Sequence, residues 1–158
     1  RLLVLPDGTW LVVYTIYDNY GYTFDPQGGT ALEFAESKDG GANWSVVGRL
    51  DDPGRDLDNG QMILAQNGDI LLSCRSVRWQ ESYQLPVYCS SDGGRTWRFH
   101  SMIDEVHGPE GYLGNPDKGM YEPHFYRLHD GRLSVMYAQE KHVVTYPHYS
   151  QIIAQRGL

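Results

Sequence analysis

The stretch Ser37-Lys38-Asp39-Gly40-Gly41-Ala42-Asn43-Trp44 returns later in the chain as Ser90-Ser91-Asp92-Gly93-Gly94-Arg95-Thr96-Trp97. Both copies share the frame S-x-D-G-G-x-[N/T]-W, and their aspartates lie 53 positions apart (92 minus 39). Asp-Gly-Gly permits positive φ and a tight reversal, and the carboxylate can accept backbone N–H groups while the Trp covers the turn. Because similarity at a fixed period indicates stacked units, we expect a structural turn in each unit, formed by Ser37, Asp39, Gly41, Trp44 and by Ser90, Asp92, Gly94, Trp97.

A second phrase also recurs. Asp-Gly or Asn-Gly precedes an apolar run at Gly8, Gly68 and Gly131, at intervals of 60 (68 minus 8) and 63 (131 minus 68). Such dipeptides between extended runs are preferred two-residue hairpin turns. The two repeats together describe a unit of four antiparallel strands, which is the blade of a β-propeller.

We therefore predict an all-β fold made of about three blades: an incomplete blade over 1–50, a full blade over 51–106, and a blade over 107–158 that is cut before its outer strand. Long loops are expected over 17–30, 78–85 and 107–118, and the next Asp-Gly-Gly-type turn is expected to begin at 156–158. Strands are predicted near 10–15, 30–36, 61–66, 69–75, 86–90, 122–128, 132–138 and 149–155.

Composition narrows the class of partner. The chain has 13 Lys and Arg against 20 Asp and Glu, a net charge of -7, and no basic run. These features disfavour a nucleic acid or an anionic membrane as partner. Two Cys and six scattered His give no metal-ligand spacing, and no phosphate-binding loop or dinucleotide fingerprint occurs. We expect no cofactor and no metal, and a neutral or polymeric substrate.

The two cysteines fall on neighbouring predicted strands. If the connecting loop centres near residues 81 and 82, the sequence numbers of two facing residues add up to 163. Cys74 would then lie directly opposite Cys89. A disulfide and a pair of buried free thiols are both compatible with that placement.

The repeated frame resembles the Asp-box, or BNR, repeat of the sialidase superfamily, although the first copy has Asn43 where Thr is usual. Tyr121-Glu122-Pro123, together with 128–133 and 137–140, resembles the exo-1,5-α-L-arabinanases of glycoside hydrolase family 93. This resemblance implies a six-bladed retaining enzyme whose Asp boxes lie away from the active site. It implies that Glu122 is the general acid/base and that a later blade supplies the nucleophilic Glu. The chain begins with Arg1, so we expect a processed or excised segment. We expect the protein to be extracellular or periplasmic, and secreted.

The candidate site centres on Glu122, the predicted catalytic residue, on the innermost strand of the third blade. Glycoside hydrolysis uses two carboxyl groups, one of which protonates the leaving oxygen. A structural alternative is that Glu122 accepts a hydrogen bond from a neighbouring blade. Candidate substrate-binding residues are Asp58, Asn59, Arg75, Glu140 and the loop aromatics Tyr20, Tyr22, Trp79 and Tyr112.

These binding candidates also have structural alternatives. Asp58 and Asn59 could form a turn that starts a strand, and Glu140 could be a solvated strand end. Arg75 resembles the arginine of the family's R-N phrase, but Ser76 replaces Asn.

Three functions remain open at this point: an exo-acting arabinanase on plant polysaccharide, an exo-α-sialidase, and a non-catalytic Asp-box protein that binds carbohydrate or acts as a scaffold. A sialidase needs an arginine cluster for the substrate carboxylate. The F-R-I-P phrase found early in sialidase sequences is absent from this sequence, and a position before Arg1 stays open for it. In each case we expect the remaining blades of the parent chain, or another copy of this chain, to cover the open edge.

Overall fold

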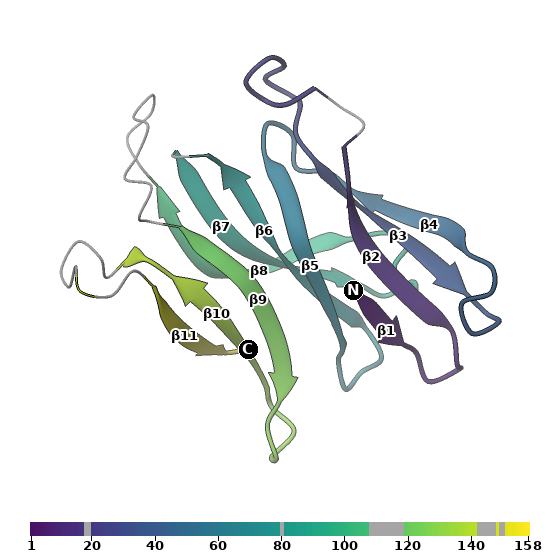
Figure 1. The fold of residues 1–158 in the computed structure, drawn as a ribbon. Helices are drawn as coiled ribbons and strands as arrows, with labels where there is room; N and C mark the ends of the chain where they lie inside the picture. Colours follow the sequence, from purple (N-terminus) through teal and green to yellow (C-terminus); the bar gives the residue numbers. More distant parts are fainter. Residues whose placement is uncertain (18–19, 80, 108–118, 142–147, 149–150) are drawn as a thin grey trace.

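A computed structural model describes residues 1–17, 20–79, 81–107, 119–141, 148 and 151–158. These parts of the chain form antiparallel sheets with no α-helix, so the prediction of an all-β fold is confirmed. The three sheets lie beside one another as successive layers (Figure 1). No helix among the described residues is long and apolar enough to cross a membrane.

Each sheet is a meander in which consecutive strands pair. The first sheet contains β1 (Leu2–Val4), β2 (Trp10–Ile16), β3 (Ala31–Ser37) and β4 (Ser45–Leu50). The second contains β5 (Asp56–Leu64), β6 (Ile70–Arg78), β7 (Ser82–Ser90) and β8 (Arg98–His107). The third contains β9 (Met120–Arg127), β10 (Leu133–Gln139) and β11 (Ile152–Gly157).

Several predicted boundaries are wrong. The first sheet has four strands, because the short apolar run at Leu2–Val4 pairs with β2. β7 begins at Ser82, since Arg78 already pairs with Ser82 across a tight turn, and the long loop expected over 78–85 does not exist. Arg156 and Gly157 pair with β10. Ser37 and Ser90, which begin the two observed turns, likewise pair with β2 and β6, so the turn expected from 156–158 stays a prediction.

The cysteine register is also corrected. Facing residues of β6 and β7 sum to 160, as in the pairs Leu71 with Cys89 and Ser76 with Gln84, because the connecting turn is shorter than predicted. Cys74 packs between the first and second sheets, whereas Cys89 packs between the second and third. Both are buried free thiols, and burial raises the pKa of each. The alternative of free thiols is therefore the one observed.

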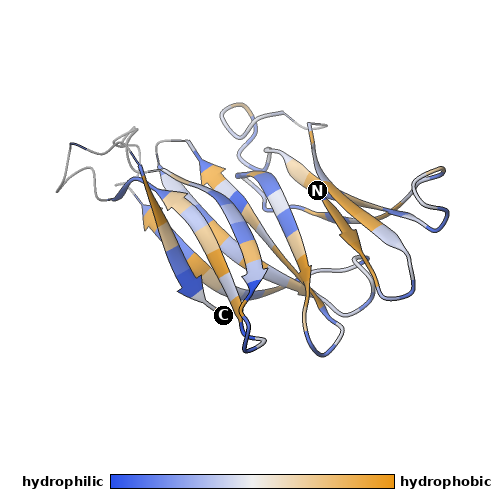
Figure 2. Cartoon of the chain, turned by 60° about the horizontal axis from the view of Figure 1, so that its bottom comes forward, coloured by the Kyte–Doolittle hydropathy of each residue, from blue (hydrophilic) through white to orange (hydrophobic). Residues whose placement is uncertain are grey.

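Apolar side chains fill the two spaces between the sheets. Apolar and polar residues are interspersed along the strands (Figure 2), but β6 and β7 of the second sheet are buried along most of their length on both faces. One core cluster joins the first and second sheets around Phe34 and Leu72, and the other joins the second and third sheets around Leu85 and Val135. The second sheet is thus covered on both faces, which fixes the positions of its neighbours.

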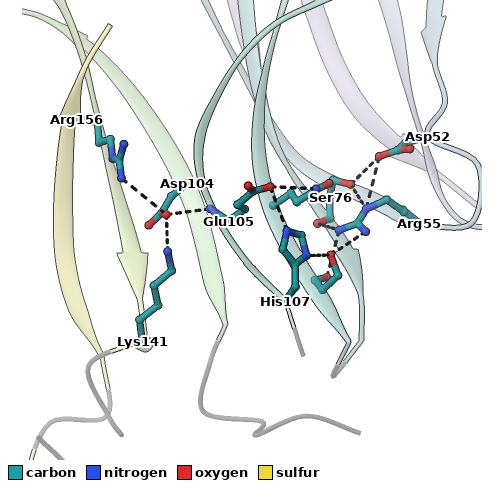
Figure 3. Close-up of polar contacts among 10 residues, drawn as sticks. Asp52, Arg55, Ser76, Asp104, Glu105, His107, Lys141 and Arg156 are labelled. Carbon is teal, nitrogen blue, oxygen red and sulfur yellow. Dashed lines mark hydrogen bonds and ion pairs between the residues drawn. The ribbon is translucent and has the colours of Figure 1, made fainter. Parts of the chain in front are cut away.

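Polar contacts add to this packing (Figure 3). Arg55 donates to Ser76 Oγ at 2.6 Å and to Ser82 Oγ at 2.9 Å, and so ties the chain before β5 to β6 and β7. Asp104 on β8 accepts a bond from Tyr137 of the third sheet at 2.9 Å and forms an ion pair with Lys141. The Arg55 contacts thus lie within the second blade, whereas those of Asp104 connect the second sheet to the third blade.

Both Asp-Gly-Gly stretches are turns with matching hydrogen bonds. Ser90 Oγ donates to Asp92 at 2.8 Å, and Thr96 donates to the same carboxylate through both its backbone N–H and its hydroxyl. In the first copy, the Asn43 N–H and side-chain amide donate to Asp39 at 2.9 and 2.7 Å. The amide thus replaces the Thr hydroxyl, which explains why the substitution in the frame leaves the turn intact.

Candidate functional site

A β-bulge interrupts the innermost strand of the second sheet and of the third. On β5, Asp58 pairs with Arg75 and Gln61 with Ser73, so two residues oppose one. On β9 and β10, Tyr121 pairs with Ala138 and the next pair is His124 with Met136. Asn59 and Glu122 occupy the same position in the two bulges, 63 residues apart (122 minus 59), which is also the interval between the hairpin glycines Gly68 and Gly131.

These two bulge residues share an unusual backbone. Asn59 has φ 51° and Glu122 has φ 55°, and they are the two non-glycine residues of positive φ in the described ranges. Left-handed backbone is unfavourable for L-residues other than Gly and, to a lesser degree, Asn and Asp. At Glu122 the surrounding structure must therefore impose the conformation, and such imposed backbone is typical of functional sites.

Packing against the neighbouring sheet explains the bulge on β5. A Cβ atom at Gly60 would lie 3.0 Å from Val13 and 3.2 Å from Leu32 of the first sheet. The backbone of β5 therefore lies close to that sheet at this residue. Pro123, at the matching position of β9, is fully buried. In both strands the bulge residue thus lies near the start of the strand and is followed by a residue that is packed in the interior.

A pocket of about 240 Å³ opens at this point, lined by Asn59, Arg75, Tyr121, Glu122, Ala138, Glu140 and Gln151. Four of the seven were candidates from the sequence: Asn59, Arg75, Glu122 and Glu140. The exposed side chain of Glu122 forms no hydrogen bond or ion pair with any residue that the structure describes. The alternative of a structural acceptor bond to a neighbouring blade therefore has no support within those residues.

Arg75 and Asp58 form a closed pair beside the pocket. The Arg75 guanidinium donates Nε to Asp58 Oδ1 at 2.8 Å, and its Nη2 contacts the other carboxylate oxygen. Burial alone would lower the pKa of Arg75, but the bond to Asp58 and its negative charge raise it. Arg75 lines the pocket, but the carboxylate of Asp58 neutralises its positive charge. Asp58 itself does not line the pocket.

Tyr121 and Glu140 form a second fixed group. The Tyr121 hydroxyl donates to Glu140 Oε2 at 3.1 Å, and the Gly119 N–H donates to the same oxygen at 2.9 Å. Burial, followed by the charge of Glu140, raises the pKa of Tyr121 to about 12, so the phenol stays protonated. Glu140 therefore anchors the start of β9, and Arg75 lies over the Tyr121 ring at 5.4 Å.

Tyr20, Tyr22 and Trp79 do not line this pocket. Tyr20 is 79% exposed. The Tyr22 hydroxyl accepts a hydrogen bond from the backbone N–H of Trp79 at 2.6 Å, and the Arg78 guanidinium lies over the Tyr22 ring. Trp79 is 52% exposed at the β6–β7 turn, where its ring meets the edge of Tyr83. Tyr112 lies outside the described residues.

The sequence reasoning missed three pocket residues, Tyr121, Ala138 and Gln151. Tyr121 could have been found from its place next to Glu122 on the same strand. Gln151 precedes β11 without any motif, so only the fold brings it to this place. No group of three metal-ligating side chains occurs among the residues described.

No protein-family model matches the chain, and no curated protein matches it. Solved structures do. An α-L-arabinofuranosidase from Fusarium graminearum, solved with an iminosugar inhibitor, matches with a TM-score of 0.72 and 22% identity over 99% of this chain and 44% of its own. An α-L-arabinanase from Penicillium chrysogenum, complexed with arabinobiose, gives 0.71 and 22% over 98% and 44%. A Hadza microbial sialidase gives 0.57 and 18% over 86% and 28%.

This chain therefore spans less than half of the length of the first two solved structures, and the likeness concerns the fold. The suspected resemblance to the sialidase superfamily and to the family 93 arabinanases is confirmed at that level. The three sheets have the arrangement of neighbouring blades in these β-propellers.

Proposed function

We propose that this chain carries part of the active site of a glycoside hydrolase, a retaining exo-acting arabinanase on plant polysaccharide. The observation that carries the proposal is Glu122: an exposed carboxyl without a partner among the described residues, held in left-handed backbone at the edge of a polar pocket. A carboxyl free of ion pairs can exchange a proton, which a general acid must do. A structural carboxylate would instead be expected to have hydrogen-bond partners.

In this proposal, Glu122 donates its proton to the glycosidic oxygen as the bond to the anomeric carbon breaks. A second carboxylate attacks that carbon, and the deprotonated Glu122 then activates the water that releases the sugar. Glu140 Oε2 accepts bonds from Tyr121 and Gly119, which gives this carboxylate a structural role at the start of β9. We assign the nucleophile to a carboxylate outside residues 1–158.

The pocket favours a neutral sugar over a sialoside. A sialic acid carboxylate needs free guanidinium groups, and the Arg75 guanidinium at this pocket is already paired with Asp58. Arabinose-containing ligands carry hydroxyls instead, which suit the amide and carboxyl groups of Asn59, Glu122 and Gln151. The arabinobiose in the Penicillium structure and the iminosugar in the Fusarium structure support the same class.

The outer faces of the first and third sheets support the proposal that further blades, or another copy of the chain, complete the propeller. Val4 on the first sheet and Ile153 on the third are 53% and 68% exposed, and other apolar side chains on these faces are also accessible. Exposed apolar faces on strands commonly mark interfaces. Because polymeric plant glycans lie outside cells, we further propose that the protein is secreted.

The test is hydrolysis by the full-length protein of linear α-1,5-arabinan oligosaccharides, compared with 3′-sialyllactose. We expect release of short arabinose products with retained anomeric configuration. NMR spectroscopy of the first products measures that configuration. Release of sialic acid instead would establish the sialidase alternative. Binding of arabinan without cleavage would establish the non-catalytic carbohydrate-binding protein.

A further inference from the structure

We propose that Asn59 is a specificity-determining residue whose side-chain amide binds a sugar hydroxyl next to Glu122. This inference rests on the proposed function and deepens it, because it names the group that holds the substrate in place for the acid. It starts from the two matching bulges, one of which carries the proposed acid and the other Asn59.

The position of Asn59 fits this role. Asn59 lines the same pocket as Glu122 and comes from the neighbouring sheet. Its side chain has no hydrogen-bond partner within the described part of the chain, although it is only partly exposed. The carboxylate of the adjacent Asp58 accepts a hydrogen bond from Arg75, and Gly60 lies close to Val13. Neither of these two described neighbours forms a hydrogen bond with the Asn59 amide. The amide is therefore available to a ligand.

The chemistry of the amide also fits. An asparagine side chain offers two donor hydrogens and an acceptor oxygen, so it can bind a sugar hydroxyl in either direction. It does so without charge. A carboxylate at the same place would lie in one pocket with Glu122, and like charges disfavour ionisation of both groups. The amide can thus fix a neutral sugar without changing the proton balance of the acid.

A purely structural explanation has to be separated from this one. Asn tolerates left-handed backbone better than most residues, so Asn59 could be present for its conformation alone. Glycine adopts the same backbone without strain. The substitution Asn59→Gly therefore keeps the bulge and removes the amide, and the two explanations predict opposite outcomes for it.

The experiment uses the full-length protein and measures kcat/KM on arabinan oligosaccharides, with thermal melting as the control for folding. We expect Asn59→Gly to melt at or above the wild-type temperature and to lose on the order of 10- to 100-fold in kcat/KM, as expected for one lost hydrogen bond to substrate. Asn59→Asp, which keeps the shape but adds charge, should shift the pH profile of kcat/KM as well. Activity of Asn59→Gly equal to wild type would overturn the proposal.

Mono-deoxy oligosaccharides provide a sharper test. Wild type should discriminate against the analogue that lacks the bound hydroxyl, and Asn59→Gly should not, because the hydroxyl and the amide form one interaction. Equal discrimination by both proteins for every analogue would overturn the assignment of the amide to a hydroxyl.

The two proposals fail in different ways. If the wild-type protein hydrolyses no arabinan, the proposed function fails, and titration with arabinobiose then decides the role of Asn59. Binding that weakens in Asn59→Gly would keep the residue as a sugar-binding group. Binding that is absent, or equal in both proteins, would remove it.

Discussion

The two ends of the blades repeat in different ways. At the hairpin end, the turns at Asp39 and Asp92 share their sequence and their hydrogen bonds. At the opposite end, the bulges on β5 and β9 share their backbone, although Asp58-Asn59-Gly60-Gln61 and Tyr121-Glu122-Pro123-His124 have no residue in common. The sequence repeat thus coincides with a shared set of turn hydrogen bonds, whereas the backbone repeat carries side chains that differ between the two sheets.

The comparison extends to the tryptophans of the two turns. Each Trp indole donates to the carbonyl of a turn glycine, at 3.0 Å for Trp44 and 3.2 Å for Trp97. Trp97 then stacks on Phe34 of the first sheet with ring centroids 4.6 Å apart, whereas Trp44 is 43% exposed. The local turn is the same, and only the Trp97 ring, which has a preceding sheet beside it, packs against a core cluster.

The largest effect should come from Glu122→Gln, which keeps the shape of the side chain and removes the titrating proton. We expect a loss on the order of 10² to 10⁴ in turnover on arabinan oligosaccharides, the usual contribution of a general acid. Aryl arabinosides with very good leaving groups need little protonation and should lose much less at the glycosylation step. Steady-state and burst kinetics measure both.

Glu122→Gly is the matched control for this variant, because glycine accepts φ 55° without strain. It should also lose activity, while its melting temperature should not fall. An equal rate loss on good and poor leaving groups, combined with a lower melting temperature in both variants, would identify Glu122 as a structural carboxylate and remove the distinction between the two ends of the blades.

The next effect is on stability and separates the two tryptophans. Trp97→Ala should cost about 2–4 kcal/mol in the free energy of unfolding, since it removes a large ring packed between two sheets. Trp44→Ala should cost no more than about 1 kcal/mol, because it loses one exposed hydrogen bond and little packing in these residues. Denaturant melts of the two variants measure the difference. If a further blade packs on the first sheet of the full-length protein, the two costs should become similar there.

The smallest effect is a loss of folding stability at low pH. Bonds from the Asn43 side chain and from the Thr96 side chain lower the pKa of Asp39 and of Asp92, each to about 2. A carboxyl with a lowered pKa in the folded state adds stability above its unfolded value near 3.8, and this stability is lost as the pH falls toward 2. Thermal melts between pH 5 and pH 2 should show this loss, and Asp39→Asn and Asp92→Asn should each reduce it by a similar, small amount.

A difference between the two Asn variants in this acid range would contradict the equivalence of the turns. Both carboxylates are exposed, so solvent screening keeps the effect small even where the pKa is strongly lowered.

Much of the fold follows from the sequence alone. The Asp-Gly-Gly turns and the Asn-Gly and Asp-Gly hairpins are predictable because their hydrogen bonds connect residues within five positions, as from Thr96 to Asp92. The alternation of apolar residues gives the strands, and the repeat interval gives the blades. Glu122, Asn59, Arg75 and Glu140 were also identified from the sequence as candidates for one site.

Tertiary structure alone decided how those candidates are used. The register of β5 and β6 pairs Asp58 with Arg75, so the two charges neutralise each other, and the register of β6 and β7 keeps Cys74 away from Cys89. The close approach of Gly60 to the first sheet accompanies the bulge that turns Asn59 into the pocket beside Glu122. Register and close approach depend on residues far apart in the chain, and a pattern within one strand does not contain them.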